Sequence, residues 1–223
     1  MKIFWTILLN TVLISMVVFA NPAEPQQSDP VKTIKEMVNI ISTNMVADRD
    51  LKEAASKDKK LFEGYRNKNQ GFYKQLSQFM DFEKLGSDSM TKKWKDQYWK
   101  RSSNKKKFLE TLQALIEEIV YPRGKEFFDK VTVNYDQPKL SQDGKQADVI
   151  CTIHVKENKQ VQLQYRLVLQ GSMWKIYDVN LEGEWWTESF KSQFNHIITT
   201  KSYDELILAM EKKLQNHLSW RAS

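Results

Sequence analysis

The chain has 223 residues, which is enough for one domain of ordinary size or at most two small ones. Hydrophobic residues make up 41% of it and aromatic residues 12%, so it can build a real core, and an intrinsically disordered chain is excluded. The formal net charge of +6 at pH 7 suits attraction to anionic lipid surfaces or to acidic partner proteins.

Residues 1–20 have the pattern of a targeting segment rather than of a folded element. Lys2 is followed by an almost wholly apolar run, and Val18 and Ala20 stand at the −3 and −1 positions of a cleavage site. We therefore expect a secretory signal peptide over residues 1–20 and a flexible polar lead-in over residues 21–28. An uncleaved membrane anchor is the alternative, because about 18 apolar residues lie at the lower limit for spanning a bilayer. Export argues against nucleic acid as the partner.

The first helix is expected to begin at Asp29-Pro30. A carboxylate can cap the free N–H groups of the first turn, and proline fits the first helical position. Apolar residues then recur on one face as far as Met45. Residues 48–60 are charged and the periodicity fades, so we expect a helix end and a loop there.

A second helical region is expected over residues 61–86. Its apolar residues recur at helical spacing, and Gly86 is placed to end it. The clearest amphipathic helix of the chain follows over residues 105–121.

Residues 91–101 combine basic and aromatic side chains. In a nucleic-acid-binding protein this mixture would suggest a binding face. In an exported protein we expect Trp94 and Tyr98 to pack inward, while the lysines between them remain solvated.

The strongest pattern in the chain is a hairpin followed directly by a helix. Apolar and polar residues alternate over residues 161–169, as in a strand with one buried face. Residues 170–172 contain a glycine and can close a hairpin. The return strand, residues 173–181, is apolar on both faces, as in a strand covered on both sides. Gly183 then breaks the run, and an aromatic-faced helix is expected over residues 186–197.

Two more strands and a last helix complete the predicted elements. Residues 131–135 and 149–155 alternate in hydrophobicity, and an Asp-Gly turn lies between them. Residues 202–205 form a capping box that opens the last helix. This order predicts an α+β fold, in which helices pack on one side of a curved antiparallel sheet of four or slightly more strands. We expect a single domain over residues 29–217.

Groups that could carry chemistry are sparse. The three histidines are isolated, and the sequence has neither a nucleophile motif nor a glycine-rich phosphate loop, so we expect no catalytic and no metal site. Cys151 is the only cysteine, and it is expected to be a small apolar side chain on a buried strand face. Asp178 and Glu182 are an acidic pair that would either cap or bridge the passage from strand to helix, or act as an acid and a base. Apolar faces without catalytic groups fit a cavity for an apolar ligand, and they fit an ordinary core equally well.

The central hairpin and helix resemble those of the MlaC family, the periplasmic phospholipid-binding proteins also called toluene-tolerance proteins. The resemblance covers nearly the whole chain, and it rests on the order and spacing of its segments rather than on any single motif. The matching segments are Trp174-Lys175-Ile176-Tyr177-Asp178-Val179, Leu181-Glu182-Gly183, Gln193-Phe194 and Ile197-Ile198, and more weakly Asp81-Phe82, Leu85-Gly86 and Trp94.

The resemblance implies a fold like that of nuclear-transport-factor-2-like domains, with the sheet and helices enclosing an apolar cavity. It also implies a soluble monomeric carrier in the periplasm that is not an enzyme, has no cofactor and holds phospholipid as cargo. Family members shuttle lipid between an outer-membrane lipoprotein–porin complex and an inner-membrane ABC transporter that bears MCE domains.

We expect the apolar faces of the helices and strands to line the cavity. By alternation, Leu163, Tyr165 and Leu167 share a face, which should point at the helix that carries Phe190 and Phe194. The predicted lipid-binding residues are Phe79, Phe82, Leu85, Leu112, Ile116, Val149, Cys151, Ile153, Leu163, Tyr165, Leu167, Trp174, Ile176, Val179, Trp186, Phe190 and Phe194.

The sequence departs from the family pattern after Gly183. Trp185 and Trp186 stand where the family has smaller residues, and they would narrow the cavity mouth or change the ligand. Lys191 replaces an arginine and loses bidentate phosphate recognition, if that was the arginine's role. Two other functions stay open: a small exported enzyme on the same fold, with Asp178 as the nearest acid–base candidate, and a protein-binding module that uses the aromatic helix as its interface.

Overall fold

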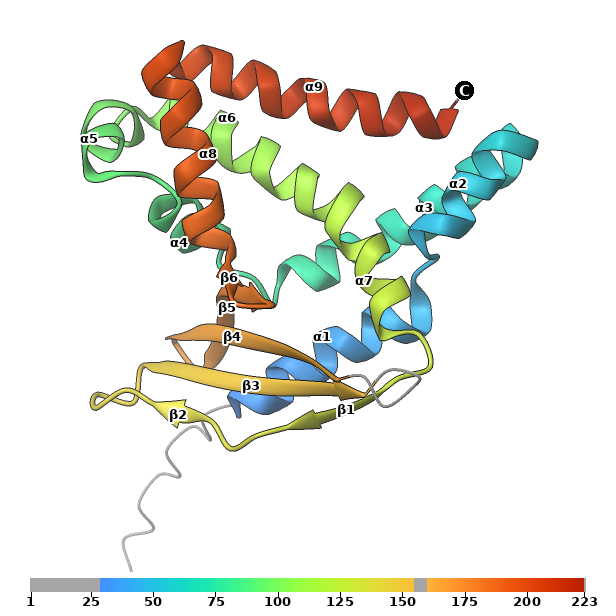
Figure 1. The fold of residues 1–223 in the computed structure, drawn as a ribbon, viewed down its shortest axis with the longest axis horizontal. Helices are drawn as coiled ribbons and strands as arrows, with labels where there is room; N and C mark the ends of the chain where they lie inside the picture. The colour runs from blue at the N-terminus through green and yellow to red at the C-terminus, as the bar shows by residue number, and fades with distance from the viewer. Residues whose placement is uncertain (1–28, 155–159, 223) are drawn as a thin grey trace, which may run out of the picture.

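The computed structural model describes residues 29–154 and 160–222 (Figure 1). The predicted signal peptide, the lead-in and Val155 lie outside these residues. Helices come first, strands follow and two helices close the chain, which confirms the α+β class. The helical elements are α1 (Pro30–Asn44), α2 (Asp48–Lys57), α3 (Lys59–Ser77), α4 (Phe82–Asp88), α5 (Lys92–Trp94), η1 (Lys95–Trp99), α6 (Ser102–Leu115), η2 (Ile116–Val120), α7 (Tyr121–Phe128), α8 (Trp186–Thr200) and α9 (Tyr203–Ala222). The strands are β1 (Thr132–Tyr135), β2 (Lys139–Leu140), β3 (Gln146–His154), β4 (Gln160–Gln170), β5 (Met173–Leu181) and β6 (Glu184–Trp185).

The sheet is an antiparallel meander in the order β1-β3-β4-β5-β6, and β2 pairs with β3 beside β1. The four predicted strands correspond to β1, β3, β4 and β5, and the short strands β2 and β6 are additions. The register of β4 against β5 shifts between Arg166 and Leu167, which marks a bulge. The predicted sheet is therefore confirmed, with six strands instead of four.

The helices gather on one face of the sheet (Figure 1). Burial along β3 alternates strictly, and its inward residues Val149, Cys151 and Ile153 are each at most 1% exposed. Together with the apolar faces of α1, α6 and α8, they belong to one continuous core. The predicted alternation of this strand is thus confirmed, and it fixes which face the helices cover.

Two helices begin at the predicted caps. The Asp29 carboxylate accepts a hydrogen bond of 2.9 Å from the Val31 N–H at the start of α1. The Ser202 hydroxyl accepts one of 3.1 Å from the Glu205 N–H at the start of α9. Each cap satisfies an amide that has no partner inside the helix.

The loop predicted over residues 48–60 is wrong, because α2 fills most of this segment. Leu51 and Ala54 are buried and pack with Phe62 of α3 in a small separate cluster. Only two apolar residues point inward from α2, too few for the periodicity to show in the sequence. Asp48 and Asp50 in its first turn complement the helix dipole.

The second helical region is interrupted where the chain crosses to the sheet. After α3 the backbone pairs with the free edge of β5: the Ile176 N–H donates to the Phe79 carbonyl, and the Asp81 N–H donates to the Ile176 carbonyl, both at 2.8 Å. The Asp81 carboxylate then caps α4 through the Lys84 N–H at 2.8 Å. The interruption therefore closes part of the sheet edge and starts a new helix.

Gly86 does not end a helix, as its sequence position suggested, but lies inside α4. A Cβ atom at this position would lie 3.0 Å from side-chain atoms of both Phe108 and Leu109. Glycine is needed here for the close approach of α4 to α6, and not for a turn.

The segment 91–101 folds inward, as predicted. Trp94 is 7% exposed, and its Nε1 donates to Asn195 Oδ1 of α8 at 3.0 Å. Tyr98 stacks on Tyr203 of α9 with 4.4 Å between ring centroids. Both aromatic residues therefore join this segment to the two C-terminal helices.

The helix predicted over residues 105–121 continues to Phe128 through the π-helical turn η2. Pro122 has no N–H, so it cannot donate to the Glu118 carbonyl four residues earlier. His217 Nε2 of α9 lies 3.1 Å from that carbonyl oxygen. The proline thus accounts for the widened turn, after which α7 extends over the sheet.

Candidate functional site

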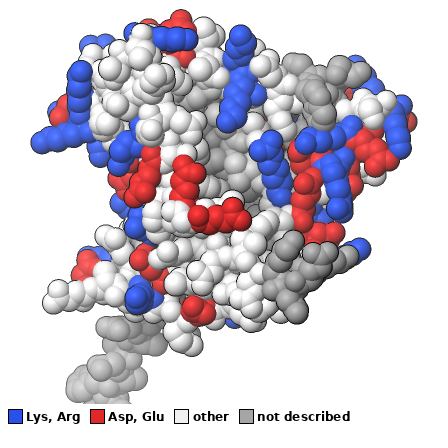
Figure 2. All heavy atoms as spheres, in the orientation of Figure 1, with Lys and Arg blue, Asp and Glu red and all other residues white. Residues whose placement is uncertain are grey.

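An apolar pocket of about 480 Å³ lies between the sheet and the helices. This volume is within the range of about 300–1,000 Å³ typical of ligand sites. Its walls come from α1, α7, β4, β5, β6 and the start of α8. Figure 2 shows a hollow in the middle of this face of the molecule, between the sheet and the helices.

The floor of the pocket is formed by the two central strands. Tyr165 and Val179 are cross-strand partners, as are Leu163 and Leu181, and all four line the pocket. Burial raises the pKa of Tyr165 well above its ordinary value, so its hydroxyl stays neutral. The floor is therefore uncharged.

The wall opposite α8 comes from the first and the seventh helix. Met37 and Ile41 of α1 and Phe127 and Phe128 of α7 face the pocket. The ring of Tyr121 also lines it, and burial raises the pKa of this phenol above its ordinary value. Tyr121, Phe127 and Phe128 belong to α7, which directly follows the turn η2.

The remaining wall is the first turn of α8, which carries Trp186 and Phe190. Their ring centroids are 6.4 Å apart, and Phe190 stacks on Phe194 at 5.6 Å. Phe194 in turn meets Phe108 of α6 edge to face at 5.5 Å. A row of aromatic rings thus joins the pocket wall to the core.

Asp178 on β5 fixes the start of α8. Its carboxylate is 1% exposed and accepts hydrogen bonds from the Thr187 hydroxyl at 2.6 Å and from the Thr187 N–H at 3.1 Å. Arg166 lies 3.5 Å from the same carboxylate, and its guanidinium stacks over the Trp185 ring at 3.7 Å. Asp178 therefore caps the helix, which confirms the structural alternative for this residue. Glu182 lies in the exposed turn before β6, with φ of +54°.

Besides the two tyrosines, the polar side chains of the described pocket lining are Arg123 of α7, Glu184 of β6 and Ser189 of α8. Arg123 Nε lies 4.0 Å from the buried Asp48 carboxylate, and the side chain remains 62% exposed. Lys52 and His217 also contact Asp48, at 2.9 and 3.8 Å. Lys52 and His217 line a neighbouring hollow, and Arg123 borders both that hollow and the pocket.

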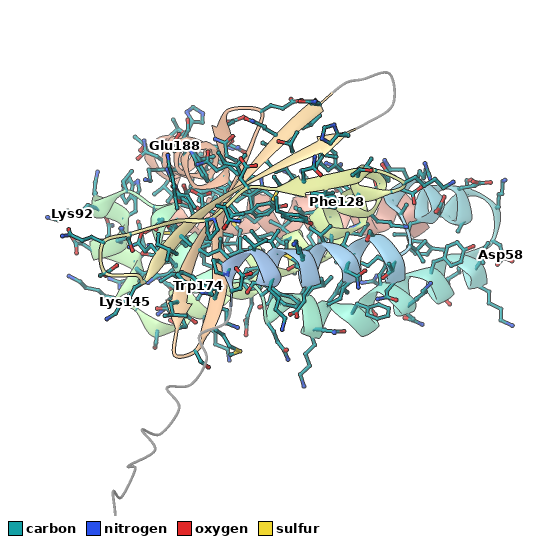
Figure 3. All side chains as sticks on the ribbon, turned by 90° about the horizontal axis from the view of Figure 1, so that it is seen from below. Asp58, Lys92, Phe128, Lys145, Trp174 and Glu188 are labelled. Carbon is teal, nitrogen blue, oxygen red and sulfur yellow. The ribbon has the colours of Figure 1, made fainter. Side chains whose placement is uncertain are left out.

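The structure brings five of the predicted lipid-binding residues together: Leu163, Tyr165, Val179, Trp186 and Phe190 line the pocket. The other predicted residues lie in the core or against it, outside the pocket lining. They are Phe79, Phe82, Leu85, Leu112, Ile116, Val149, Cys151, Ile153, Leu167, Trp174, Ile176 and Phe194. Figure 3 shows Trp174 well apart from Phe128 of the pocket wall.

The strand face predicted to carry Leu163, Tyr165 and Leu167 lies partly against the pocket and partly in the closed core. Leu163 and Tyr165 meet the pocket together with Phe190, whereas Leu167 is fully buried beyond the bulge. Lys191 also lies away from the pocket, in a polar groove on the outer face of α8. Its replacement of an arginine therefore does not alter the pocket lining.

Pocket residues that sequence reasoning missed come mainly from α1, α7 and the link before α4. The signal from Met37 and Ile41 was present as an apolar helix face, but amphipathicity does not say whether such a face meets a core or a cavity. Phe127 and Phe128 fell beyond the predicted end of their helix. Met80 lies in the interruption that the sequence did not reveal.

Cys151 is buried, as predicted, and burial raises the pKa of its thiol to about 12. Within the described residues, no three or more His, Cys, Asp or Glu side chains are grouped to hold a metal ion. No helix in the described part of the chain is long and apolar enough to cross a membrane.

The fold and the pocket define a binding domain of mixed α and β structure. The chain belongs to the MlaC family: the family described as MlaC protein matches residues 44–212. A solved structure of a phospholipid-binding protein from Ralstonia solanacearum, in complex with a phospholipid, has a similar fold with a TM-score of 0.68. The two sequences are 20% identical, and the match covers 86% of this chain and 99% of the other. A search of curated proteins finds no match.

Proposed function

We propose that this protein is a periplasmic phospholipid carrier. The observation that carries the proposal is the apolar pocket of about 480 Å³ in a chain of the MlaC family. The pocket has an uncharged floor of strand residues and aromatic walls, and among the described lining residues only Arg123 and Glu184 are charged. Such a lining suits acyl chains inside and a headgroup at the mouth.

The energetics of acyl chains explain why a carrier of this kind depends on partners. Burying roughly 15 methylenes, about one acyl chain, at about 0.8 kcal/mol each favours the bound lipid over water by on the order of 12 kcal/mol. A bound lipid therefore escapes into solvent too slowly to be delivered that way. Transfer to a bilayer has a much smaller net free energy, because the tails are surrounded by hydrocarbon on both sides. Cargo should therefore be exchanged while the protein is docked.

This requirement calls for docking partners, and their identity is proposed from membership of the MlaC family. We propose that the protein moves as a monomer between an outer-membrane lipoprotein–porin complex and an inner-membrane ABC transporter with MCE domains. Export would use the signal peptide over residues 1–20, and the mature domain would span residues 29–217 after the lead-in. We propose binding and transfer rather than catalysis, with phospholipid as cargo and no cofactor. Binding rather than catalysis is supported by Asp178, the nearest acid–base candidate, because its buried carboxylate is already engaged by hydrogen bonds from Thr187.

Organic extraction and mass spectrometry of the purified protein test the proposal. Wild type should carry close to one phospholipid per chain. Leu163→Trp fills the floor of the pocket and should lower this occupancy several-fold, whereas Leu140→Trp places the same bulk on an exposed strand residue (56% exposed) and should leave it unchanged. Wild-type protein without lipid after gentle purification, or equal occupancy in both variants, would refute the assignment of the pocket.

A further inference from the structure

The two charged residues of the pocket have opposite signs and do not pair with each other. Arg123 of α7 and Glu184 of β6 both line the pocket, and no ion pair joins them. We propose that these two side chains select a zwitterionic phospholipid whose headgroup joins a phosphate to a primary ammonium group. The inference rests on the proposed function, and it adds the class of headgroup.

Arg123 provides the phosphate side of this site. Its Nε lies 4.0 Å from Asp48, and the side chain is 62% exposed, so the other guanidinium donors can reach a ligand. A guanidinium carries five donors in a planar fork that matches phosphate oxygens, and it remains charged throughout the physiological range.

The surroundings of Arg123 favour an anion on the α7 side. Arg123 also borders a neighbouring hollow of about 400 Å³, whose lining includes Lys52, Lys213 and His217. Asp48 is the carboxylate that Lys52 and Arg123 share. Lys52 and Arg123 around this carboxylate, together with Lys213 in the lining of the hollow, leave a positive potential behind the mouth of the pocket.

Glu184 provides the ammonium side. It is exposed at the opposite wall and forms no ion pair with any residue that the structure describes. Ser189 lines the pocket on the same wall and adds a hydroxyl. Figure 2 shows acidic side chains over the region of β6, and basic side chains at the opposite border of the hollow with acidic ones beyond them. The mouth is therefore polarised from α7 to β6.

This polarity distinguishes among common headgroups. A phosphate joined to a primary ammonium satisfies both sides, because the ammonium can donate hydrogen bonds to a carboxylate. A glycerol headgroup leaves the lipid with a net negative charge and offers Glu184 no cation. A quaternary ammonium has a charge but no donor for the carboxylate. The expected order of preference is phosphatidylethanolamine first, then phosphatidylcholine and phosphatidylglycerol.

Competitive loading measures this preference. Delipidated protein is incubated with vesicles of equal parts phosphatidylethanolamine and phosphatidylglycerol, separated from them, extracted and analysed by mass spectrometry. Because the mouth is exposed, wild type should enrich phosphatidylethanolamine by about two- to fivefold over the vesicle ratio. Glu184→Gln should bring the ratio close to that of the vesicles at unchanged total occupancy. Arg123→Gln should lower the occupancy by both lipids.

Glu188→Gln is the matched control, because Glu188 is an acidic residue of α8 that lines the outer polar groove instead of the pocket. It should leave the lipid ratio as in wild type. A wild-type protein that loads lipid without preference, or an equal change of ratio in both glutamate variants, would overturn the inference while leaving the carrier function intact. A protein that loads neither lipid would refute the proposed function itself.

Discussion

Two leucines of the same strand face allow a quantitative test of where the pocket ends. Leu163 lines the pocket and is 6% exposed, whereas Leu167 lies four residues along β4 and is fully buried outside it. Leu→Ala at each position removes the same atoms. The two variants should therefore differ in how their stability responds to lipid.

The expected magnitudes follow from what surrounds each leucine. Leu167→Ala opens a new void in close-packed structure and should lower the free energy of unfolding by about 2–5 kcal/mol, with or without lipid. Leu163→Ala enlarges a pocket that exists already, so the lipid-free protein should lose only about 1–2 kcal/mol. In the loaded protein Leu163→Ala also removes contacts with the acyl chain, so the loss should be larger.

Urea unfolding of wild type and both variants, each delipidated and reloaded, provides the measurement. Bound lipid stabilises the folded state by linkage, and the difference between the loaded and the empty protein reports that stabilisation. The difference should shrink in Leu163→Ala and stay as in wild type in Leu167→Ala. A loss of 2–5 kcal/mol at Leu163 in both states would show that this residue is ordinary core packing and would refute the placement of the pocket.

Four further predictions concern the start of α8 and the core around the site. Asp178→Ala leaves the Thr187 groups without their acceptor and should lower the free energy of unfolding by about 2–4 kcal/mol in urea titrations, and a loss below about 0.5 kcal/mol would contradict the capping role. Gly86→Ala should cost about 1–3 kcal/mol through overpacking, whereas Gly64→Ala, with open space around it, should be neutral or stabilising by up to about 1 kcal/mol; equal effects would refute the close-approach argument. The Cys151 thiol, with its pKa raised to about 12, should resist a maleimide at pH 8 until the chain unfolds, and rapid labelling of the native protein would contradict its burial. In the unfolded chain the Cys151 thiol ionises near its ordinary pKa of 9.0, whereas in the folded protein its pKa is raised to about 12. The buried neutral thiol should therefore contribute fully to stability below pH 9, and this contribution should fall as the pH rises towards 12. Thermal melts of wild type and Cys151→Ala across this pH range measure the effect.

The sequence was most informative where local patterns and tertiary packing agree. The alternation of β3 and β4, the caps at Asp29 and Ser202, and the aromatic face of α8 all follow from periods of two or of 3.6 residues. The α2 helix was missed because only Leu51 and Ala54 mark its inner face. The extent of α7 was missed because Pro122 usually signals a helix boundary, whereas here the helix widens and continues past it.

The pocket was only partly predictable, and the reason is physical. Leu112, Ile116 and Leu167 have the same apolar character as Leu163, and each faces the interior. Whether an inward residue meets another side chain or an open space depends on how far apart the elements stand. That spacing is set by the π-helical turn η2, by the bulge in β4 and by the interruption before α4. None of these features has a periodic signature in the sequence.

The backbone bridge between the segment before α4 and β5 bears on how the protein avoids self-association through its sheet. A strand at the border of a sheet offers unpaired amides to any other chain that approaches in an extended form. On β5 the bridge at Ile176 occupies part of this border, and pairing with β6 at Asn180 and Leu181 occupies more. Main-chain hydrogen bonds therefore limit pairing with another chain along these parts of the edge, whether the pocket is full or empty. The resistance of the protein to self-association through this edge should therefore be the same with and without bound lipid.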